Sequence, residues 1–171
     1  IATIVNTSID RYFPPESNVE VIAEPGRFYV VSAFSLTTNV IGKRKDITDD
    51  KVFITYYVND GLFGSFANTR FGDEIVEPIP EIKDISKRKL VNSIIWGQTC
   101  EDDCIRTEVV LPEMEIGEWM TFKDMGAYSL VLFTNFNGFQ VPMLKCHVSD
   151  SATKFLQKLP SCNRLLKVLS F

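Results

Sequence analysis

The sequence predicts a mainly β protein: a β-sandwich or Greek-key barrel domain, preceded by the last helix and strand of an α/β (TIM) barrel. Two observations lead to this class. Beyond residue 33 the chain is a series of short runs rich in β-branched and aromatic residues, separated by turn-forming residues, which is typical of sandwiches and barrels. Before that point a helical pattern feeds one short apolar strand, an order typical of α/β folds. We therefore expect a barrel remnant over 1–33, a β domain over 34–150 and a helical tail over 151–171.

The first elements are predicted from apolar spacing and from prolines. Residues 1–13 carry apolar side chains at helical spacing, and Pro14-Pro15 ends that helix. Val19–Ala23 is expected to be a strand, followed by a brief helix through Ala33 and a second strand ending at Gly42. Because the chain begins without an initiator methionine or a leader pattern, we expect a truncated start.

The β domain is predicted from alternation and turn residues. A charged loop over 43–51 precedes the strand Val52–Val58, and a turn at Asn59-Asp60-Gly61 would pair that strand with Leu62–Ala67. A connector rich in proline and charge covers Pro78–Lys89. The later strands expected are Leu90–Trp96, Arg106–Leu111, Glu118–Phe122, Tyr128–Thr134 and Val141–Val148. Helical spacing returns only in the tail.

Composition and charge argue against several classes of function. The chain has 171 residues, of which 45% are hydrophobic and 23% charged, as in globular proteins. A net charge of −4 and a pI of about 5.1 provide no electrostatic footprint for nucleic acid. The longest apolar runs, such as Ser129–Phe133, are too short to cross a bilayer. We expect neither a nucleic-acid partner nor a membrane partner.

The cysteines indicate a reducing compartment. Cys100, Cys104, Cys146 and Cys162 lack the spacing of a disulfide framework, so reduced thiols and a cytoplasmic location are expected. No metal site is expected either. Cys100 and Cys104 alone do not complete a ligand set, and the single histidine, His147, lies far along the chain.

The stretch from Val19 to Arg27 has the pattern of a phosphate-binding turn. A strand, a Pro-Gly turn and a helix start leave backbone N–H groups free, and the guanidinium of Arg27 adds positive charge. Glu24, at the carboxyl end of the predicted strand, would point an anionic oxygen into the same binding site. The same pattern also fits an ordinary strand-to-helix turn with a surface arginine.

Several motifs taken together resemble one family. They are Glu24-Pro25-Gly26-Arg27, Tyr56-Tyr57-Val58-Asn59-Asp60-Gly61, Trp96-Gly97-Gln98-Thr99-Cys100, Leu111-Pro112-Glu113-Met114, Met125-Gly126-Ala127-Tyr128 and Phe136-Asn137-Gly138-Phe139-Gln140. In this order they resemble the C-terminal part of the eukaryotic ornithine decarboxylase and antizyme inhibitor family. Its active members are pyridoxal-phosphate decarboxylases built from an alanine-racemase-like barrel and a β domain. The resemblance extends from about Ile1 to Val148.

The resemblance implies which residues bind the cofactor. Pro25, Gly26 and Arg27 would hold the phosphate of pyridoxal phosphate, with Tyr128 as a further donor. Glu24 would face the pyridine nitrogen, where a carboxylate keeps that nitrogen protonated and lets the ring accept electrons.

The resemblance also implies the substrate site. Asp60, with Asn59 beside it, would receive the distal ammonium of ornithine or a related basic amino acid; without the family, the same residues indicate first of all a hairpin turn. Cys100 resembles the cysteine that returns a proton to the α-carbon after carbon dioxide leaves. The acidic run after it disfavours the thiolate, which suits a proton donor. In the family this loop crosses a two-fold interface, so Cys100, Glu101 and Phe136 would serve the other subunit of a homodimer.

The match departs from the family in the substrate loop. The family usually has aspartate in place of Glu101 and proline in place of Gln98. The lysine that bonds the cofactor belongs to earlier barrel strands, so this chain alone is expected to be inert.

The resemblance leaves two functions open. The first function is decarboxylation of ornithine to putrescine in polyamine synthesis. The second is that of an inactive antizyme inhibitor, but such inhibitors typically lose the residues kept here as Arg27 and Tyr128, and antizyme would bind a barrel surface outside this chain.

Overall fold

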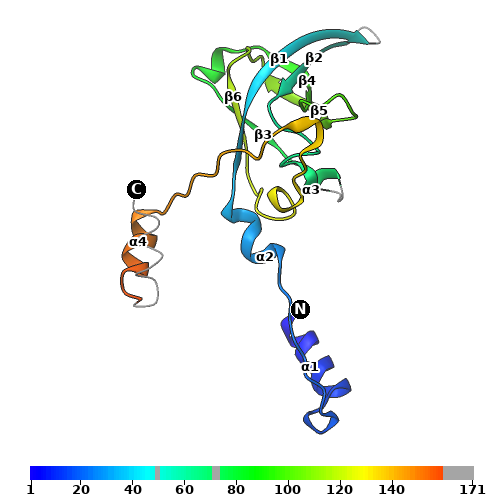
Figure 1. The fold of residues 1–171 in the computed structure, drawn as a ribbon, viewed down its shortest axis with the longest axis vertical. Helices are drawn as coiled ribbons and strands as arrows, with labels where there is room; N and C mark the ends of the chain where they lie inside the picture. The colour runs from blue at the N-terminus through cyan, green and yellow to red at the C-terminus, as the bar shows by residue number, and fades with distance from the viewer. Residues whose placement is uncertain (49–50, 71–73, 160–171) are drawn as a thin grey trace.

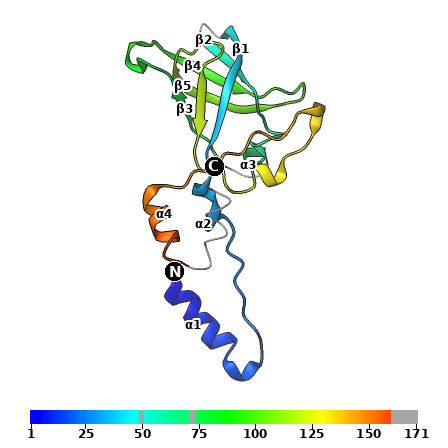
Figure 2. The same ribbon diagram turned by 60° about the vertical axis from the view of Figure 1, so that its left-hand side comes forward.

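A computed structural model of the chain describes residues 1–48, 51–70 and 74–159. Its strands form one curled six-stranded sheet in the order β3-β6-β1-β2-β4-β5, and helices α1 and α4 stand away from that sheet (Figures 1 and 2). The strands are β1 (Leu36–Thr48), β2 (Lys51–Val58), β3 (Pro78–Glu81), β4 (Leu90–Trp96), β5 (Cys104–Pro112) and β6 (Trp119–Phe122). The α-helices are α1 (Ala2–Tyr12), α2 (Arg27–Val30), α3 (Ala67–Arg70) and α4 (Asp150–Leu156). Single 3-10 turns are η1 (Pro15–Ser17), η2 (Val31–Ala33), η3 (Ile85–Lys87), η4 (Leu130–Leu132) and η5 (Phe136–Gly138). The mainly β class is confirmed.

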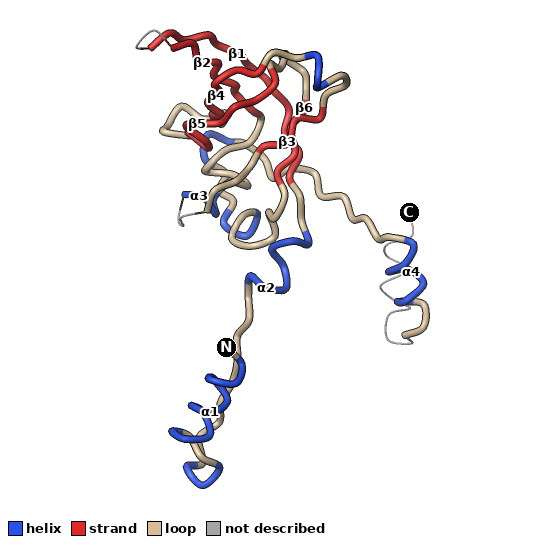
Figure 3. The backbone as a smooth tube through the Cα atoms, turned by 180° about the vertical axis from the view of Figure 1, so that it is seen from behind, coloured by secondary structure: helices blue, strands red, loops and turns tan. Residues whose placement is uncertain are grey.

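The long strand β1 gives the sheet its curl. Its first half pairs antiparallel with β6, from Leu36 opposite Phe122, and its second half pairs antiparallel with β2, from Val40 opposite Val58. The register shifts between Val40 and Gly42, and such a bulge bends a strand and increases its twist. Beyond β2 the sheet continues through β4, which runs parallel to β2, and ends at β5 (Figure 3).

The hydrophobic core lies against the inner face of this curl. The apolar residues Ile54, Tyr56 and Val58 of β2 alternate along the strand and lie in this core, as the period-two pattern of a strand predicts; Thr55 on the other face is buried as well. Phe122 of β6 is fully buried and packs edge-on against Phe66, with ring centroids 4.7 Å apart. The other buried members of the cluster are Val40, Val76, Ile95, Ile105, Leu111, Met114, Met120 and Met125.

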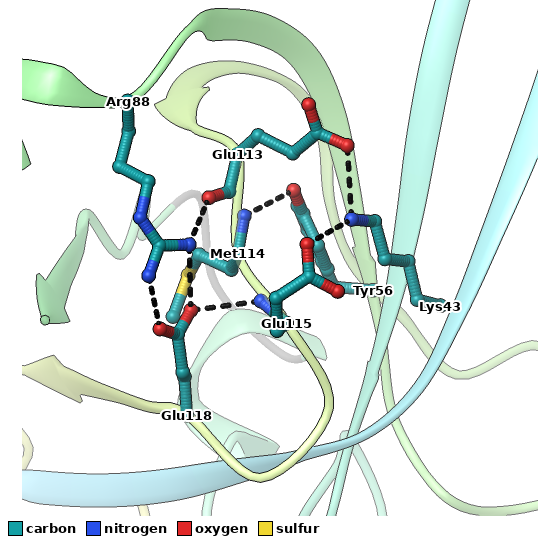
Figure 4. A network of polar contacts seen from close by, with 7 residues as sticks. All are labelled: Lys43, Tyr56, Arg88, Glu113, Met114, Glu115 and Glu118. Carbon is teal, nitrogen blue, oxygen red and sulfur yellow. Dashed lines mark hydrogen bonds and ion pairs between the residues drawn. The ribbon is translucent and has the colours of Figure 1, made fainter.

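A polar network fixes the loop between β5 and β6 (Figure 4). Lys43 Nζ lies 2.9 Å from Glu113 Oε1 and 3.0 Å from Glu115 Oε1. Burial by itself lowers the pKa of Lys43, but the hydrogen bonds to these two carboxylates outweigh it and leave the pKa above its ordinary value. Arg88 donates to Glu118 Oε1 at 2.6 Å and to the Glu113 carbonyl at 2.9 Å. The Leu-Pro-Glu-Met motif is therefore held by charged groups from β1 and from the segment between η3 and β4.

The first predicted helix is confirmed, but the strand predicted at Val19–Ala23 is wrong. That segment is extended and exposed, and it pairs with no strand in the described part of the chain. The reason is physical, because a strand needs a neighbour for its backbone hydrogen bonds whereas α1 satisfies its own. The brief helix through Ala33 is confirmed as α2 followed by η2.

Four of the later strands match their predictions, and two predicted loops contain strand. Val52–Val58, Leu90–Trp96, Arg106–Leu111 and Glu118–Phe122 correspond to β2, β4, β5 and β6. The charged stretch 43–48, predicted as loop, continues β1, because it forms one half of an antiparallel ribbon with β2. The proline-rich connector contains β3, an edge strand, which is where prolines are tolerated in a sheet.

Three further predicted strands are wrong. Leu62–Ala67 forms turns that lead into α3, because the Asp60 carboxylate accepts hydrogen bonds from the amides of Gly61 and Ser65 and closes the chain on itself. Tyr128–Thr134 begins with a residue at φ 56°, outside the β region, and leads into η4. Val141–Val148 is extended but unpaired within the described residues. Of the predicted helical tail, α4 begins at Asp150, one residue before the predicted start, and the part from residue 160 onward, with Cys162, lies outside the described residues.

Candidate functional site

The structure brings Gly26, Arg27 and Tyr128 together at the start of α2. The guanidinium carbon of Arg27 lies 5.2 Å from the centroid of the Tyr128 ring. A Cβ placed on Gly26 would lie 3.9 Å from the Tyr128 hydroxyl, so the glycine leaves space in front of that oxygen. We call these three residues the anion cluster.

Backbone hydrogen bonds explain how residues a hundred positions apart meet in the anion cluster. The amide of Gly126 donates to the Val31 carbonyl at 2.9 Å, and the amide of Met125 donates to the Phe34 carbonyl at 3.0 Å. A Cβ on Gly126 would collide with the Val30 carbonyl oxygen, so this close approach requires glycine. The Met-Gly-Ala-Tyr motif thus docks Tyr128 on the segment that carries Arg27.

Arg27 also forms an ion pair with Glu74, a residue that no motif or pattern in the sequence selects. The two side chains are 40% and 32% exposed, so the pair lies at the surface, where it exchanges readily with solvent ions. The cationic guanidinium, the open space at Gly26 and the exposed Tyr128 hydroxyl suit the phosphate of a cofactor.

Two of the predicted cofactor residues are not placed in this cluster. Glu24 and Pro25 are exposed on the extended segment before α2. Within the described part of the chain, Glu24 forms no ion pair or hydrogen bond. Its predicted role at a pyridine nitrogen stays a prediction.

Asp60 is a buried carboxylate with one free oxygen. Asp60 is only 4% exposed. Its Oδ1 accepts hydrogen bonds from the amides of Gly61 at 2.8 Å and Ser65 at 2.9 Å. Oδ2 is buried with no hydrogen-bond partner among the described residues. Burial raises the pKa of Asp60, against the lowering effect of these hydrogen bonds. Asn59 has a different task, since its Oδ1 accepts from the Asn39 amide at 2.7 Å and so ties the turn to β1.

Cys100 and Phe136 lie in one further cluster. The amide nitrogen Nδ2 of Asn137 donates to Cys100 Sγ at 3.3 Å. The ring of Phe136 packs on Phe63 with centroids 4.5 Å apart, and the Arg70 guanidinium lies 4.2 Å from the Phe63 centroid. Cys100 is exposed, as a group that must reach a substrate would be. Glu101 is exposed beside it.

Asp103 is the residue in this region that the sequence analysis missed. It is fully buried, and its carboxylate accepts from the Leu62 amide at 2.5 Å and from the Thr99 amide at 2.9 Å. A Cβ on either Gly61 or Gly97 would collide with this carboxylate. Gly61, in the turn after β2, and Gly97, at the start of the Cys100 loop, were therefore the sequence signal for a buried side chain between them.

The acidic run after Cys100 is thus split between surface and interior. Glu101 and Asp102 are exposed, whereas Asp103 points inward. Burial, followed by the charge of Asp102, raises the pKa of the Cys104 thiol. No three or more His, Cys, Asp or Glu side chains gather into a possible metal site in residues 1–48, 51–70 and 74–159. Over the same ranges, every helix is too short or too polar to span a lipid bilayer.

Comparison with known proteins identifies the class to which this fold and these clusters belong. The family model described as "Pyridoxal-dependent decarboxylase, C-terminal sheet domain" matches residues 28–126, more than half of the chain. The chain belongs to this family of pyridoxal-dependent decarboxylases.

Individual relatives narrow the comparison. The chain is 42% identical to Antizyme inhibitor 2 of Xenopus laevis over 93% of its own length and 37% of that protein. It is also 42% identical to the ornithine decarboxylase of Cricetulus griseus, over 84% of its own length and 33% of the enzyme. The solved arginine decarboxylase of Paramecium bursaria Chlorella virus, bound to agmatine, superposes with a TM-score of 0.69 at 37% identity, over 81% of this chain and 36% of that one. The chain therefore spans little more than a third of the relatives that it matches.

Proposed function

We propose that this chain is the C-terminal part of a pyridoxal-phosphate-dependent decarboxylase that acts on a basic amino acid, with ornithine as the first candidate and putrescine as its product. The observation that carries the proposal is the anion cluster. Gly26 and Arg27 meet Tyr128 across a hundred residues of sequence, and they do so through the family's Met-Gly-Ala-Tyr motif. A surface arginine on an ordinary turn has no need of that arrangement.

Pyridoxal phosphate, when bound, supplies an electron sink for the carbanion left by decarboxylation. The residues of this chain would bind and orient it. Arg27 would donate to phosphate oxygens from its guanidinium, Tyr128 from its hydroxyl, and Gly26 would admit the phosphate close to the backbone. Glu24, at the end of the segment that leads to Gly26, would hold a proton on the ring nitrogen.

Asp60 supports a basic substrate in particular. A buried carboxylate with an unpartnered oxygen lacks a cation, and its charge is further disfavoured by the nearby carboxylate of Asp103. The distal ammonium of ornithine or lysine would supply both the missing charge and the missing hydrogen bond. Glu101 is one methylene longer than the family's aspartate, which would make the pocket shallower.

Cys100 would hold the proton that is returned to the α-carbon. Its sulfur accepts from Asn137, so the S–H bond itself is free to point toward a substrate. Phe136, packed on Phe63, would form an apolar wall beside it. In a cytoplasmic homodimer these two side chains and Glu101 would complete the site of the second subunit, while Arg27, Asp60 and Tyr128 serve their own.

The test is carbon dioxide release by the full-length gene product, supplied with pyridoxal phosphate and with ornithine, lysine or arginine. Turnover of one of these amino acids is expected, and Cys100→Ala should retain the cofactor but slow or misdirect protonation. If no substrate is turned over, the decarboxylase proposal fails. If Cys100→Ala leaves both rate and product unchanged, the role of Cys100 is wrong.

One observation favours a second function, that of an antizyme inhibitor. An antizyme inhibitor is among the most similar relatives, and the residues after Cys100 depart from the enzyme pattern. An inactive protein that binds purified antizyme and releases a decarboxylase from it would establish this function. The retained Arg27 and Tyr128 favour the enzyme.

A further inference from the structure

The carboxylate of Asp103 joins two loops that have no other described hydrogen bond between them. One loop is the turn 60–65, which carries Asp60. The other is the loop 97–103, which carries Cys100. Asp103 Oδ1 accepts from the Leu62 amide in the turn, at 2.5 Å, and Oδ2 accepts from the Thr99 amide in the loop, at 2.9 Å.

Each loop is also closed on itself, so the carboxylate joins two formed units. The Gly97 amide donates to the Asp103 carbonyl at 2.8 Å and closes the Cys100 loop. The Gly64 amide donates to the Gly61 carbonyl at 2.9 Å and closes the turn, with the Asp60 carboxylate inside it. A hydrogen bond from an amide to a charged carboxylate is about twice as strong as one between neutral groups.

The space around Asp103 suits aspartate in both its size and its hydrogen-bonding groups. Gly61 and Gly97 both contact the carboxylate, and a Cβ on either would occupy its place. Glutamate would not fit between them, because it carries an additional methylene. Asparagine has one acceptor and one donor at its end, so its NH₂ group would face one of the two amide donors.

We infer that Asp103 is a positioning residue that fixes the Cys100 loop against the Asp60 turn of the same chain. It thereby holds as one unit the thiol that this chain would contribute to the partner's site and the carboxylate of Asp60 in its own site. The catalytic consequence rests on the proposed function, whereas the positioning itself does not. Asp103 acts through the backbone amides of Thr99 and Leu62 and not by contact with substrate or cofactor.

The experiment uses the full-length protein with Asp103→Asn and, as matched control, Asp102→Asn. The control removes the same charge from an exposed neighbouring position that forms no described hydrogen bond. Two readouts do not depend on catalysis. They are the rate of alkylation of Cys100 by iodoacetamide, read on its peptide by mass spectrometry, and hydrogen exchange of peptides covering 60–65 and 97–103.

For Asp103→Asn we expect alkylation and exchange in both loops to change by about tenfold, the effect of losing one charge-assisted hydrogen bond. Asp102→Asn should stay within about twofold, as for a surface substitution. Unchanged alkylation and exchange in Asp103→Asn would overturn the inference. If that variant does not fold, Thr99→Pro removes the loop-side donor and leaves the buried charge in place, and it also fixes φ at residue 99. Hydrogen exchange of the turn 60–65, which the proline does not touch directly, is then the deciding readout: faster exchange is expected, and unchanged exchange would overturn the inference.

Turnover separates positioning from mere stability. With rates normalised to bound cofactor, Asp103→Asn should lower kcat through Cys100 and raise KM through Asp60, about tenfold each. A loss of cofactor-loaded protein with unchanged kcat and KM per site would show a role in stability alone and contradict the inference. If the wild type turns over no basic amino acid, the proposed function fails. Alkylation and hydrogen exchange still show whether Asp103 fixes the two loops against each other.

Discussion

The sheet and the first 26 residues use similar amino acids to different effect. Met120 and Phe122 of β6 are fully buried, whereas Ile22 in the N-terminal segment is 71% exposed. Residues 1–26 contribute no residue to the buried core. Apolar side chains are thus buried where they lie in or pack against the paired strands, and an unpaired strand sequence remains extended and exposed.

The same contrast divides the candidate site. Asp60 and Asp103 lie within the packed part, each held by backbone amides. Gly26 and Arg27 lie at the end of the exposed segment, and they are ordered by contact with Tyr128 and Glu74. The substrate-binding side of the site should therefore be rigid within this chain, and the phosphate-binding side should be more easily disturbed.

The largest test of this contrast is Phe122→Ala. It removes a fully buried ring that packs on Phe66, and should lower the free energy of unfolding by about 3–5 kcal/mol. Ile22→Ala, at an exposed position, should change it by less than about 0.5 kcal/mol. Urea unfolding followed by tryptophan fluorescence measures both. Equal losses would show that the N-terminal segment is packed after all.

A smaller loss is expected from Arg88→Ala. Its guanidinium donates to Glu118 and to the Glu113 carbonyl, so the change should cost about 2 kcal/mol in unfolding free energy. The control is Lys87→Ala next to it, which loses only an exposed pair with Asp84 and should cost about 0.5 kcal/mol at most. If Lys87→Ala lowered the free energy of unfolding as much as Arg88→Ala does, the Arg88 hydrogen bonds would not be what stabilises this region.

Asp60→Asn should stabilise the protein by about 1 kcal/mol at pH 7, because it removes a charge whose burial is unfavourable and keeps the Oδ1 acceptor. Since the folded state raises the pKa of Asp60, its protonated form contributes stability below the ordinary aspartate range, and that contribution is lost as pH rises through the folded pKa. The gain from Asp60→Asn should therefore be absent near pH 3 and grow toward neutrality. A gain independent of pH would point to another cause. Substrate turnover should be lost in the same variant.

The smallest effect is expected from deleting residues 1–18. None of them is buried, so the midpoint and slope of urea unfolding should stay within error of the full chain, about 0.5 kcal/mol. A clear fall in stability would mean that α1 packs on the sheet.

Sequence patterns predicted best where local and tertiary requirements agree. The sequence of β2 places apolar residues at alternate positions and predicts a strand. The strand forms because β2 pairs with β1 on one side and with β4 on the other. Val19–Ala23 has the same kind of composition but no partner, a fact that no local pattern contains. Leu62–Ala67 failed because one carboxylate, that of Asp60, captures the amides that a strand would offer.

The candidate site shows the same limit. Arg27 and Tyr128 were selected through motif resemblance, and their meeting depends on Gly126, whose role is visible only in three dimensions. Asp103 belongs to the acidic run after Cys100, but its burial between two glycines follows from tertiary contact that no local pattern contains. Glu74 carries no local signal at all, because exposed acidic residues are common on any protein surface.

The ion pair between Arg27 and Glu74 changes what it means for an anion to bind at this place. The guanidinium is already neutralised, so an incoming phosphate exchanges with a resident counter-ion and its net affinity is the difference between two attractions. A dianion wins that exchange more readily than a monoanion, which favours phosphate over carboxylate ligands. The displaced Glu74 side chain then returns to solvent, and its release is itself part of the free energy of loading.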